Sequence, residues 1–239
     1  MKYSLITSKK EREKIFSLFI KNKRLKFSEI EKKIEIKSNH LNYYINKMIK
    51  EDLIEKVDKS YQLTKEAEKL IPFFAHITGK EQGPLCIITA AILNNNKICL
   101  LKREKRPYQG YWGMIGGKLK LAESIKDTAL REAKEETNLN CKFEKLSAVL
   151  HERVKDKDNV KHAFVIFLCK LTTKQEIFKV TEEGELKWFN LNKIPKKIIP
   201  SDKLMIEELI ENEFCCKNII INEKEGKLKN MEIKDEDKL

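Results

Sequence analysis

Residues 115–139 read IGGKLKLAESIKDTALREAKEETNL, and this stretch decides how the second half of the chain is interpreted. Its later part predicts a helix from about Ser124 to Thr137. On that helix Glu132, Glu135 and Glu136 stand at positions i, i+3 and i+4, so three carboxylates crowd one face. Because like charges repel, such a face destabilises a helix unless a cation compensates it, and carboxylate oxygens suit Mg²⁺ or Mn²⁺. A metal site is the economical interpretation of this spacing, and a merely solvated, charged helix is the alternative.

Other residues of the stretch support the same site. Glu123 begins the helix, where a negative charge is favourable for the helix dipole, and it is a candidate metal ligand or a support for one. Arg131 stands one turn from Glu135. Gly116 and Gly117 let the backbone approach its neighbours closely.

The stretch is similar to the signature of the Nudix family, which reads Gly, five residues, Glu, seven residues, Arg-Glu, an aliphatic residue, any residue, Glu-Glu, any residue, Gly and an aliphatic residue. The corresponding positions here are Gly117, Glu123, Arg131, Glu132, Ala133, Glu135, Glu136, Asn138 and Leu139. Only Asn138 departs from the signature. Asn is the next most tolerant residue after Gly for the left-handed end of a helix, so we expect the fold to be intact. Ile115 stands where the family usually has a proline, so the loop before the glycines is expected to differ in shape.

The resemblance implies that Arg131 orients the carboxylates by hydrogen bonds and that Glu123 belongs with them to the catalytic set. The metal ligands that it implies are Glu132, Glu135, Glu136 and the main-chain carbonyl of Gly116. The expected cofactor is Mg²⁺ or Mn²⁺. The expected reaction is hydrolysis of the diphosphate of a nucleoside diphosphate linked to another moiety, as in ADP-ribose, a dinucleotide or a nucleoside triphosphate.

Substrate contacts are predicted from basic and aromatic residues around the signature. The candidates for phosphate contacts are Arg103, Arg106 and Lys118, and the candidates for stacking on a base are Tyr108 and Tyr111. Enzymes of this family often take the general base from outside the signature. The residues considered for it are Glu182, Glu183 and Glu185.

The flanking segments predict an α/β fold of the α+β type. Strand patterns cover Leu85 to Leu93, Lys97 to Lys102, Cys141 to Val154, Ala163 to Leu171 and Glu185 to Asn190. A helix follows from Ser201 to Asn212, and the last segment predicts a hairpin around residues 224–226. This order resembles the Nudix α/β/α sandwich, a mixed sheet between helices, over about residues 85–212.

The first third of the chain is organised differently. Apolar residues at helical spacing predict three helices, from Ser8 to Ile20, from Phe27 to Ile34 and from Ser38 to about Asp52. Ser28 is expected to cap the second helix with Glu31 as its partner. A small hairpin, or wing, follows at residues 54–64. A fourth helix, from Lys65 to Phe74, then packs either on the first helix or on a partner chain, so a homodimer stays open.

This order resembles the winged helix-turn-helix domains of ArsR-like regulators, over about residues 8–74. The resemblance implies that the helix from Ser38 to Lys50 reads double-stranded DNA. The side chains expected to contact DNA are Asn39, His40, Asn42, Tyr43, Asn46 and Lys47 on this helix, with Lys56 and Lys59 on the wing. The alternative is a dimerisation or protein-docking module. The acidic residues near the same face, which count against DNA, are Glu31, Glu35, Glu51 and Asp52.

Length and charge fit two domains in one chain. The 239 residues are expected to divide into a winged helix domain over residues 1–76, a linker over 77–84 and a Nudix domain over 85–239. Residues 1–80 carry 19 basic and 11 acidic side chains, so +8 of the net charge of +12 lies there, which favours an anionic partner.

The chain shows no signal peptide and no long apolar run, so we expect a cytoplasmic protein without a membrane segment. Its six scattered cysteines are expected to be reduced.

Two functions follow from this pattern. The first is a Nudix hydrolase that its winged helix localises or dimerises. The second is a DNA-binding transcription regulator whose Nudix domain senses a nucleotide-linked metabolite. A domain that only binds could lose Glu135 or Glu136, so their presence favours turnover, and a purely structural Nudix fold is disfavoured because no carboxylate of the signature is eroded. The substrate, the general base, the role of the C-terminal hairpin and the oligomeric state stay open.

Overall fold

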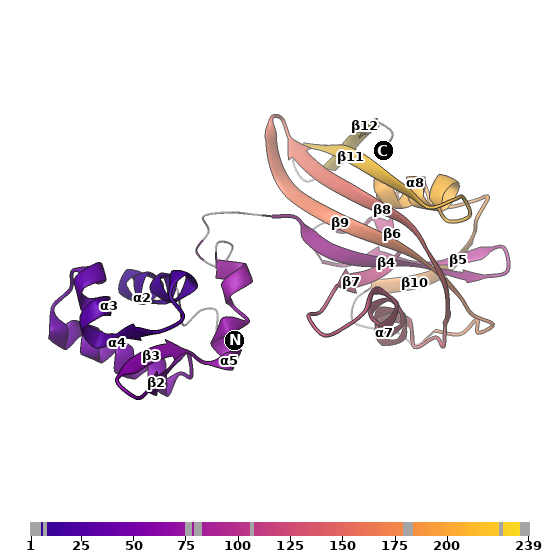
Figure 1. Ribbon diagram of the computed structural model, residues 1–239. Coiled ribbons are helices and arrows are strands. Elements are labelled where there is room, and N and C mark those ends of the chain that lie inside the picture. The colour runs from indigo at the N-terminus through magenta and orange to yellow at the C-terminus, as the bar shows by residue number, and fades with distance from the viewer. Residues whose placement is uncertain are drawn as a thin grey trace. The chain divides into compact units, whose positions relative to one another are not determined.

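The chain divides into two units, residues 1–83 and residues 84–239. The structure is a computed structural model that describes residues 6, 9–74, 78, 83–105, 108–178, 184–224 and 227–234 (Figure 1). Residues 77 and 79–82 of the predicted linker lie outside this range. None of the helices among the described residues could span a membrane.

The first unit combines short helices with a three-stranded sheet. Its elements in chain order are α2 (Lys10–Lys21), β1 (Leu25–Lys26), α3 (Phe27–Ile34), α4 (Ser38–Lys50), β2 (Ile54–Val57), β3 (Ser60–Leu63), α5 (Lys65–Glu68) and the 3₁₀ helix η1 (Ile71–Phe73). The strands lie in the order β1-β3-β2 and pair antiparallel. The second predicted helix has the predicted bounds, and the predicted wing is formed by β2 and β3.

The apolar faces of the helices meet in the core of this unit. Phe16 of α2, Ile30 of α3 and Ile45 of α4 are fully buried in it. Phe74 stacks on Phe16 with the ring centroids 5.3 Å apart. The segment after the wing therefore packs on the first helix of its own chain, which is one of the two arrangements that the sequence left open.

The predicted cap of the second helix is wrong. Helix α3 begins two residues earlier than a Ser28 cap requires, and Lys26 takes the N-cap position. The main-chain N–H of Lys26 donates to the carboxylate of Glu29 at 2.6 Å. Glu29 therefore has the role that was assigned to Glu31, whose own carboxylate accepts a hydrogen bond from Ser38.

The predicted fourth helix is interrupted. Thr64 caps its start, where its Oγ1 accepts a hydrogen bond from the N–H of Ala67 at 3.1 Å, but α5 ends at Glu68. Pro72 has no N–H to donate, and its ring clashes with the carbonyl four residues earlier in an α-helix. The chain therefore continues as the 3₁₀ turn η1.

Arg12 is a charged residue buried in the first unit. Its side chain is 1% exposed, and both of its terminal nitrogens donate to the carboxylate of Glu51 at the end of α4. Because Glu51→Ala leaves this guanidinium buried without its partner, we expect the free energy of unfolding of the unit to fall by about 3 kcal/mol. Hydrogen exchange of the α2 and α4 amides measures the change.

The double variant Arg12→Met, Glu51→Ala is the control for this prediction. It removes both charges, so we expect it to recover most of the lost stability. A double variant that is no more stable than Glu51→Ala would show that the ion pair does not account for the loss.

The second unit contains a 9-stranded sheet. Its elements are β4 (Leu85–Asn94), β5 (Lys97–Arg103), β6 (Trp112–Gly113), β7 (Ile115–Lys118), α7 (Ile125–Thr137), β8 (Lys142–Asp156), β9 (Asn159–Thr172), β10 (Gly184–Asn190), α8 (Pro200–Leu204), the π-helix η2 (Met205–Leu209), β11 (Cys215–Lys224) and β12 (Lys227–Lys234). The order is β10-β5-β4-β9-β8-β11-β12, with β6 on β5 and β7 on β4. β9 runs parallel to β4 and β11 parallel to β8, whereas the other pairs are antiparallel, so the sheet is mixed as predicted.

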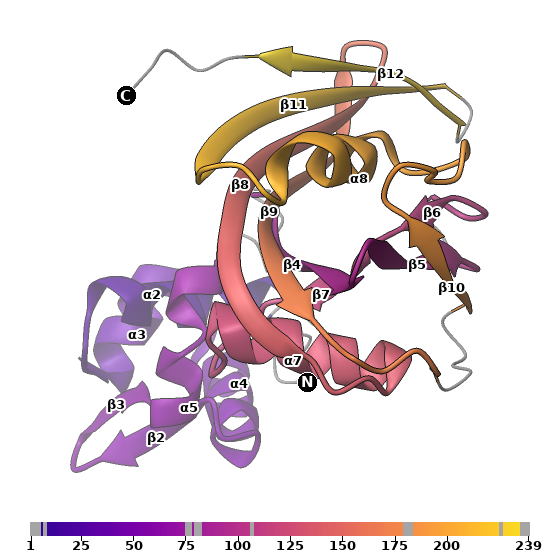
Figure 2. The ribbon, with the colours of Figure 1, turned by 90° about the vertical axis from the view of Figure 1, so that its right-hand side faces the viewer.

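Alternate residues of β4 pack against different helices. Ile88 and Ile92 lie in one core with Ala129 of α7, whereas Leu93 lies in another with Leu204 of α8. Successive side chains of a strand point to opposite faces of its sheet. The two helices therefore cover opposite faces, as Figure 2 shows. This arrangement confirms the predicted α/β/α sandwich.

The end of the chain extends the sheet. β11 pairs with β8, and β12 pairs with β11, so the predicted hairpin forms an edge of the sheet, although its turn residues 225–226 lie outside the described range. The helix expected from Ser201 to Asn212 is shorter. It begins at Pro200 and passes into η2, where the N–H of Ile210 donates to the carbonyl of Met205 at 3.1 Å.

Candidate active site

Helix α7 is closed at both ends by local hydrogen bonds. The Oγ of Ser124 accepts from the N–H of Asp127 at 3.1 Å and caps the first turn. Asn138 ends the helix with φ 60°, and its N–H donates to the carbonyl of Lys134 at 2.9 Å. Asn138 thus adopts the left-handed conformation that glycine has in the family signature, so its substitution leaves the fold intact.

Arg131 binds three glutamates of the signature. Its Nε and Nη2 donate to the two carboxylate oxygens of Glu123 at 2.7 and 2.8 Å. Its Nη1 donates to Glu132 at 2.6 Å and to Glu135 at 3.0 Å. The side chain of Arg131 is 19% exposed, so its charge-assisted hydrogen bonds to Glu123 and Glu132 are partly shielded from water, whereas the bond to Glu135 is exposed. Arg131 therefore fixes the directions of three carboxylates at once.

Glu123 is fully engaged in this network. Besides the two bonds from Arg131, it accepts a hydrogen bond from Oγ1 of Thr128 at 2.9 Å. The hydrogen bond from Arg131 lowers the pKa of Glu123. This carboxylate is tied to the start of α7, which suits a support of the neighbouring glutamates better than a direct metal ligand.

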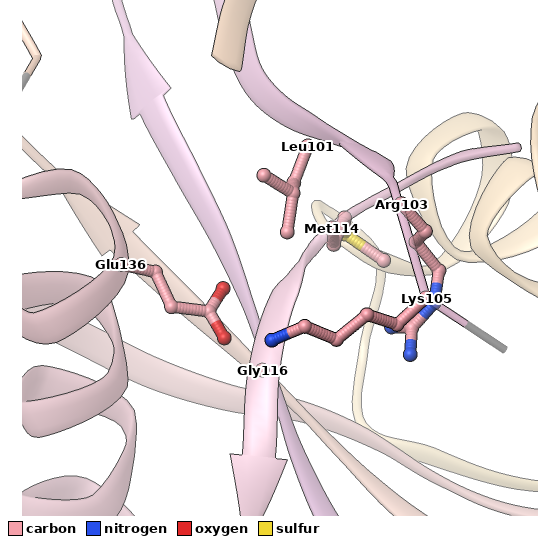
Figure 3. Close-up of a pocket in the computed structure, with 6 residues that line it drawn as sticks. All are labelled: Leu101, Arg103, Lys105, Met114, Gly116 and Glu136. Carbon is pink, nitrogen blue, oxygen red and sulfur yellow. The ribbon is translucent and has the colours of Figure 1, made fainter. Parts of the chain in front are cut away.

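A pocket lies between α7 and the strands β5 and β7 (Figure 3). Its volume is about 160 Å³, and its lining residues are Leu101, Arg103, Lys105, Met114, Gly116 and Glu136. In Figure 3 the side chains of Glu136 and Lys105 point toward each other near Gly116. Pockets that enclose a drug-sized ligand measure roughly 300–1,000 Å³. This space therefore suits an ion and a phosphate group rather than a whole nucleotide.

The two glycines are required by close approaches of β7. A Cβ on Gly117 would lie 2.1 Å from Oε1 of Glu132. A Cβ on Gly116 would lie 2.4 Å from the carbonyl oxygen of Ile88 on β4. Gly117 thus makes room for a signature carboxylate, and Gly116 makes room for the neighbouring strand.

The three predicted metal-binding carboxylates occupy different environments. Glu136 lines the pocket together with Gly116, and Glu132 lies against the adjacent Gly117 with its side chain 12% exposed. Glu135 is 57% exposed and is held by Arg131. In the part of the chain that the structure describes, no three acidic, His or Cys side chains converge closely enough to hold one ion. Of the predicted metal-binding residues, Glu136 and Gly116 are therefore the two that line the pocket.

The predicted phosphate contacts are only partly brought together. Arg103 lines the pocket. Lys118 is exposed at the end of β7 and is not among the lining residues. Arg106 lies outside the described residues. Of the three candidates, Arg103 is thus the one that the structure places beside Glu136.

The predicted base stackers are both engaged within the chain. Tyr108 packs against the core under α8, and its hydroxyl lies 3.5 Å from Oε1 of Glu152. Burial raises the pKa of Tyr108. Nζ of Lys197 lies 5.1 Å from the ring centroid of Tyr111. Neither tyrosine lines the pocket.

The general-base candidates receive little support. Glu185 is exposed on β10, with its carboxylate 3.4 Å from Nζ of Lys102 on the neighbouring strand. Glu182 and Glu183 lie outside the described residues.

Sequence reasoning missed Lys105 and two buried acids, Glu152 and Asp202. Glu152 is 2% exposed and Asp202 is 8% exposed, and burial raises the pKa of both, that of Asp202 to about 7. Oε2 of Glu152 has no hydrogen-bond partner within the described part of the chain. A signal for Glu152 was present, because it stands between the buried Leu150 and Val154 at an inward position of β8.

The residues predicted to contact DNA lie on the surface of the first unit. All eight are exposed on α4 and on the wing. Two of the four acidic residues that counted against DNA are engaged elsewhere, because Glu51 binds the buried Arg12 and Glu31 binds Ser38. The charge of Glu51 is therefore offset by the guanidinium of Arg12.

The fold and the site together define a class of protein. In this class a helix that carries glutamates bound by one arginine, here α7, packs against a pair of glycines on a strand of a mixed sheet, here Gly116 and Gly117 of β7. A family model described as NUDIX domain matches residues 85–209, more than half of the chain. A second one, described as winged helix-turn-helix, matches residues 14–81. The chain therefore belongs to the Nudix family, as a hydrolase of the pyrophosphohydrolase class with a winged helix domain before its Nudix domain.

Curated relatives and a solved structure agree with this assignment. The chain is 29% identical to an ADP-ribose pyrophosphatase of Methanocaldococcus jannaschii over 122 residues, 51% of this chain and 71% of that protein. It is 30% identical to a putative 8-oxo-dGTP diphosphatase of Bacillus subtilis over 127 residues, 53% of this chain and 78% of that protein. The crystal structure of a MutT protein from Bacillus halodurans shares the fold, with a TM-score of 0.51, 20% identity and coverage of 62% of this chain and 97% of the other.

Proposed function

We propose that this protein hydrolyses the diphosphate of a nucleoside diphosphate linked to another moiety, with a divalent metal bound between α7 and β7. The observation that carries the proposal is a single pocket in which Glu136 and Gly116 meet the basic side chains of Arg103 and Lys105. The oxygen donors suit a hard cation, and the basic side chains suit phosphate oxygens. A metal-bound diphosphate combines both partners.

The residues present fit Mg²⁺ or Mn²⁺. The carboxylates of Glu136 and Glu132 and the carbonyl of Gly116 are oxygen donors of the kind that these ions prefer. Arg131 donates a hydrogen bond to Glu132 and so orients one of these metal-binding carboxylates. When bound, the ion supplies charge neutralisation at the diphosphate and lowers the pKa of a bound water.

The other residues of the pocket bind and orient the substrate. Arg103 and Lys105 hold the phosphate oxygens on the side that faces Glu136. Leu101 and Met114 form an apolar wall that keeps bulk water away from part of the site. Arg131 sets the carboxylate directions before the substrate arrives, so little reorganisation accompanies the reaction.

A substrate panel tests the proposal. Two relatives are named for ADP-ribose and 8-oxo-dGTP, so the panel contains both, together with NADH and a dinucleoside polyphosphate. With Mg²⁺ we expect at least one of them to yield a nucleoside monophosphate and a phosphorylated remainder, or pyrophosphate from a triphosphate. We expect EDTA to abolish the reaction. Folded protein that turns over no member of the panel with Mg²⁺ or Mn²⁺ contradicts the proposal.

The contact between Gly117 and Glu132 gives a further prediction. Gly117→Ala places a methyl group on the Glu132 carboxylate. We expect kcat/KM to fall by about 10²-fold, because displacements of about 1 Å in a catalytic site have costs of this size. Steady-state kinetics with the best panel substrate measures the loss.

A double-mutant cycle separates this clash from general damage. Glu132→Asp shortens the carboxylate side chain by one methylene and so relieves the contact with the new methyl group. We therefore expect Glu132→Asp to cost less activity in the Gly117→Ala background than in the wild type. If the activity losses of the two single variants simply add in the double variant, the new methyl group does not act through Glu132.

We also propose that the first unit binds double-stranded DNA. The supporting observation is the exposed polar face of α4, where Asn42, Tyr43 and Asn46 stand beside Lys47. Asn side chains can read base edges in the major groove, and lysines can neutralise phosphates. The net charge of +8 over residues 1–80 supports an anionic partner.

Salt dependence tests DNA binding. Fluorescence anisotropy with a labelled duplex is expected to show affinity that falls linearly on a log–log plot against salt concentration. Lys47→Ala is expected to weaken binding at every sequence and to reduce the salt slope by about one. Phosphate contacts are strong at about 50 mM salt. A protein that binds no duplex at this concentration, or whose affinity for DNA does not depend on salt concentration, contradicts this second proposal.

A further inference from the structure

The main chain changes neighbouring strands at Met114, just before the glycine pair. Gly113 of β6 pairs with Leu101 of β5, whereas β7 starts at Ile115 and pairs with β4. Between the two strands, the N–H of Met114 donates to Oδ2 of Asp202 at 2.7 Å. A side chain from α8 therefore supplies the acceptor at the point where the chain crosses from one strand to the next.

The residues before Asp202 hold the same segment. The N–H of Trp112 donates to the carbonyl of Lys197, and the N–H of Ile199 donates to the carbonyl of Trp112, both at 2.9 Å. A Cβ on Gly113 would lie 2.7 Å from Oδ2 of Asp202 and 3.0 Å from Cδ1 of Ile199. Residues 112–114 are thus fastened along their length to residues 197–202, with no room for a side chain at Gly113.

This attachment has consequences for the pocket. Met114 lines it, and Gly116, the proposed carbonyl ligand, follows two residues later. Each residue has only two freely rotating backbone dihedrals, so fixing the peptide of Met114 restricts the direction of the next carbonyls. Without an acceptor, the buried N–H would carry a desolvation cost, and the segment would shift to relieve it.

We propose that Asp202 is a positioning residue, which holds Met114 so that the carbonyl of Gly116 faces Glu136. Asp202 contributes no atom to the pocket lining and acts from a helix on the other face of the sheet. The inference rests on the proposed metal-dependent hydrolysis for its kinetic consequences. Its structural consequence, protection of the Met114 amide, is independent of that function.

Two substitutions of Asp202 separate its acceptor from its charge. Asp202→Ala removes the acceptor, whereas Asp202→Asn keeps a carbonyl oxygen for the Met114 N–H. For Asp202→Ala we expect Mn²⁺ binding without substrate to weaken and kcat to fall, each by about 10- to 100-fold, as for other residues that support ligands. The Met114 amide should exchange faster. For Asp202→Asn we expect Mn²⁺ binding and kcat to stay close to the wild type and the Met114 amide to exchange no faster.

Two further variants serve as positive and negative controls. Gly113→Ala pushes against Asp202 and Ile199 without changing either, so we expect it to weaken Mn²⁺ binding as Asp202→Ala does. Ser147→Ala removes a buried hydrogen bond of 3.0 Å to the carbonyl of Ile210, beyond the other end of η2. This variant tests whether a general loosening of α8 and η2 is enough to disturb the metal site. We expect Mn²⁺ binding and kcat to be unchanged.

The outcomes distinguish failure of the inference from failure of the proposed function. The inference is overturned if Asp202→Ala binds Mn²⁺ like the wild type, or if Asp202→Asn loses as much as Asp202→Ala. If Asp202→Ala does not fold, Gly113→Ala and Asp202→Asn decide the question by the same readouts. If the wild type neither binds Mn²⁺ nor turns over any substrate, the proposed function fails, and Met114 exchange in the variants still tests the attachment.

Discussion

Glu136→Gln is expected to lower kcat by about 10³-fold or more and to leave the fold intact. Glu136 lines the pocket opposite Gly116 and faces the basic side chains. The amide has the size of the carboxylate but no charge, so it binds a divalent cation weakly. A bound metal contributes several kcal/mol to stabilising the transition state, and about 1.4 kcal/mol corresponds to a tenfold change in rate. Kinetics at saturating Mg²⁺ with the best panel substrate measures the effect.

Glu207→Gln is a matched control for this variant. Glu207 lies on η2, where its side chain is 46% exposed and 3.8 Å from Nζ of Lys203. The substitution removes the same charge from the same domain, outside the pocket, so we expect kcat to be unchanged. A Glu136→Gln protein that keeps more than about a tenth of the activity, which is a loss of less than about 1.4 kcal/mol, contradicts the assigned role of Glu136.

Asp202→Asn is expected to stabilise the protein at alkaline pH. Burial raises the pKa of Asp202 from 3.8 to about 7 in the folded protein. Below pH 4 the carboxyl is protonated whether folded or unfolded, and it contributes no pH dependence. Between pH 4 and 7 the unfolded chain loses its proton first, so the stability of the wild type falls as the pH rises. Above pH 7 the carboxyl is ionised in both states, so the full free-energy cost of burying its charge lowers the stability of the folded protein.

The size of this effect follows from the shift in pKa. Each pKa unit corresponds to about 1.4 kcal/mol, so the free energies of unfolding of Asp202→Asn and the wild type should differ by roughly 4 kcal/mol at pH 8. The difference should shrink toward zero near pH 4. Urea denaturation of both proteins at a series of pH values measures it. A difference that is independent of pH, or that is largest at acid pH, contradicts the raised pKa of Asp202.

The parts that the sequence predicted well depend on local chemistry. Glu132, Glu135 and Glu136 share a helix because their spacing matches the helical period. Asn138 ends that helix because its side chain tolerates the left-handed conformation. Likewise, the strand-forming residues from Leu85 to Leu93 predicted a strand, and β4 covers Leu85–Asn94.

The parts that it did not predict depend on contacts between distant segments. Met114 and Asp202 are 88 residues apart in the chain and meet only because β6 lies beside the segment before α8. Tyr108 was expected to meet a base, but packing turns its hydroxyl toward Glu152. Nothing local to the sequence of Lys105 indicates that it lines the pocket with Glu136. Such contacts are set by the packing of the sheet and not by any residue pattern along one element.

Crystals soaked in Mn²⁺ test where the metal binds. An anomalous difference map at the manganese edge shows where the ion binds. We expect a peak in the pocket, coordinated by the carboxylates of Glu136 and Glu132 and by the carbonyl of Gly116, and we expect this peak to be lost in Glu136→Gln. A well-ordered peak at another site, or none in the pocket of an active crystal, would contradict this location of the metal.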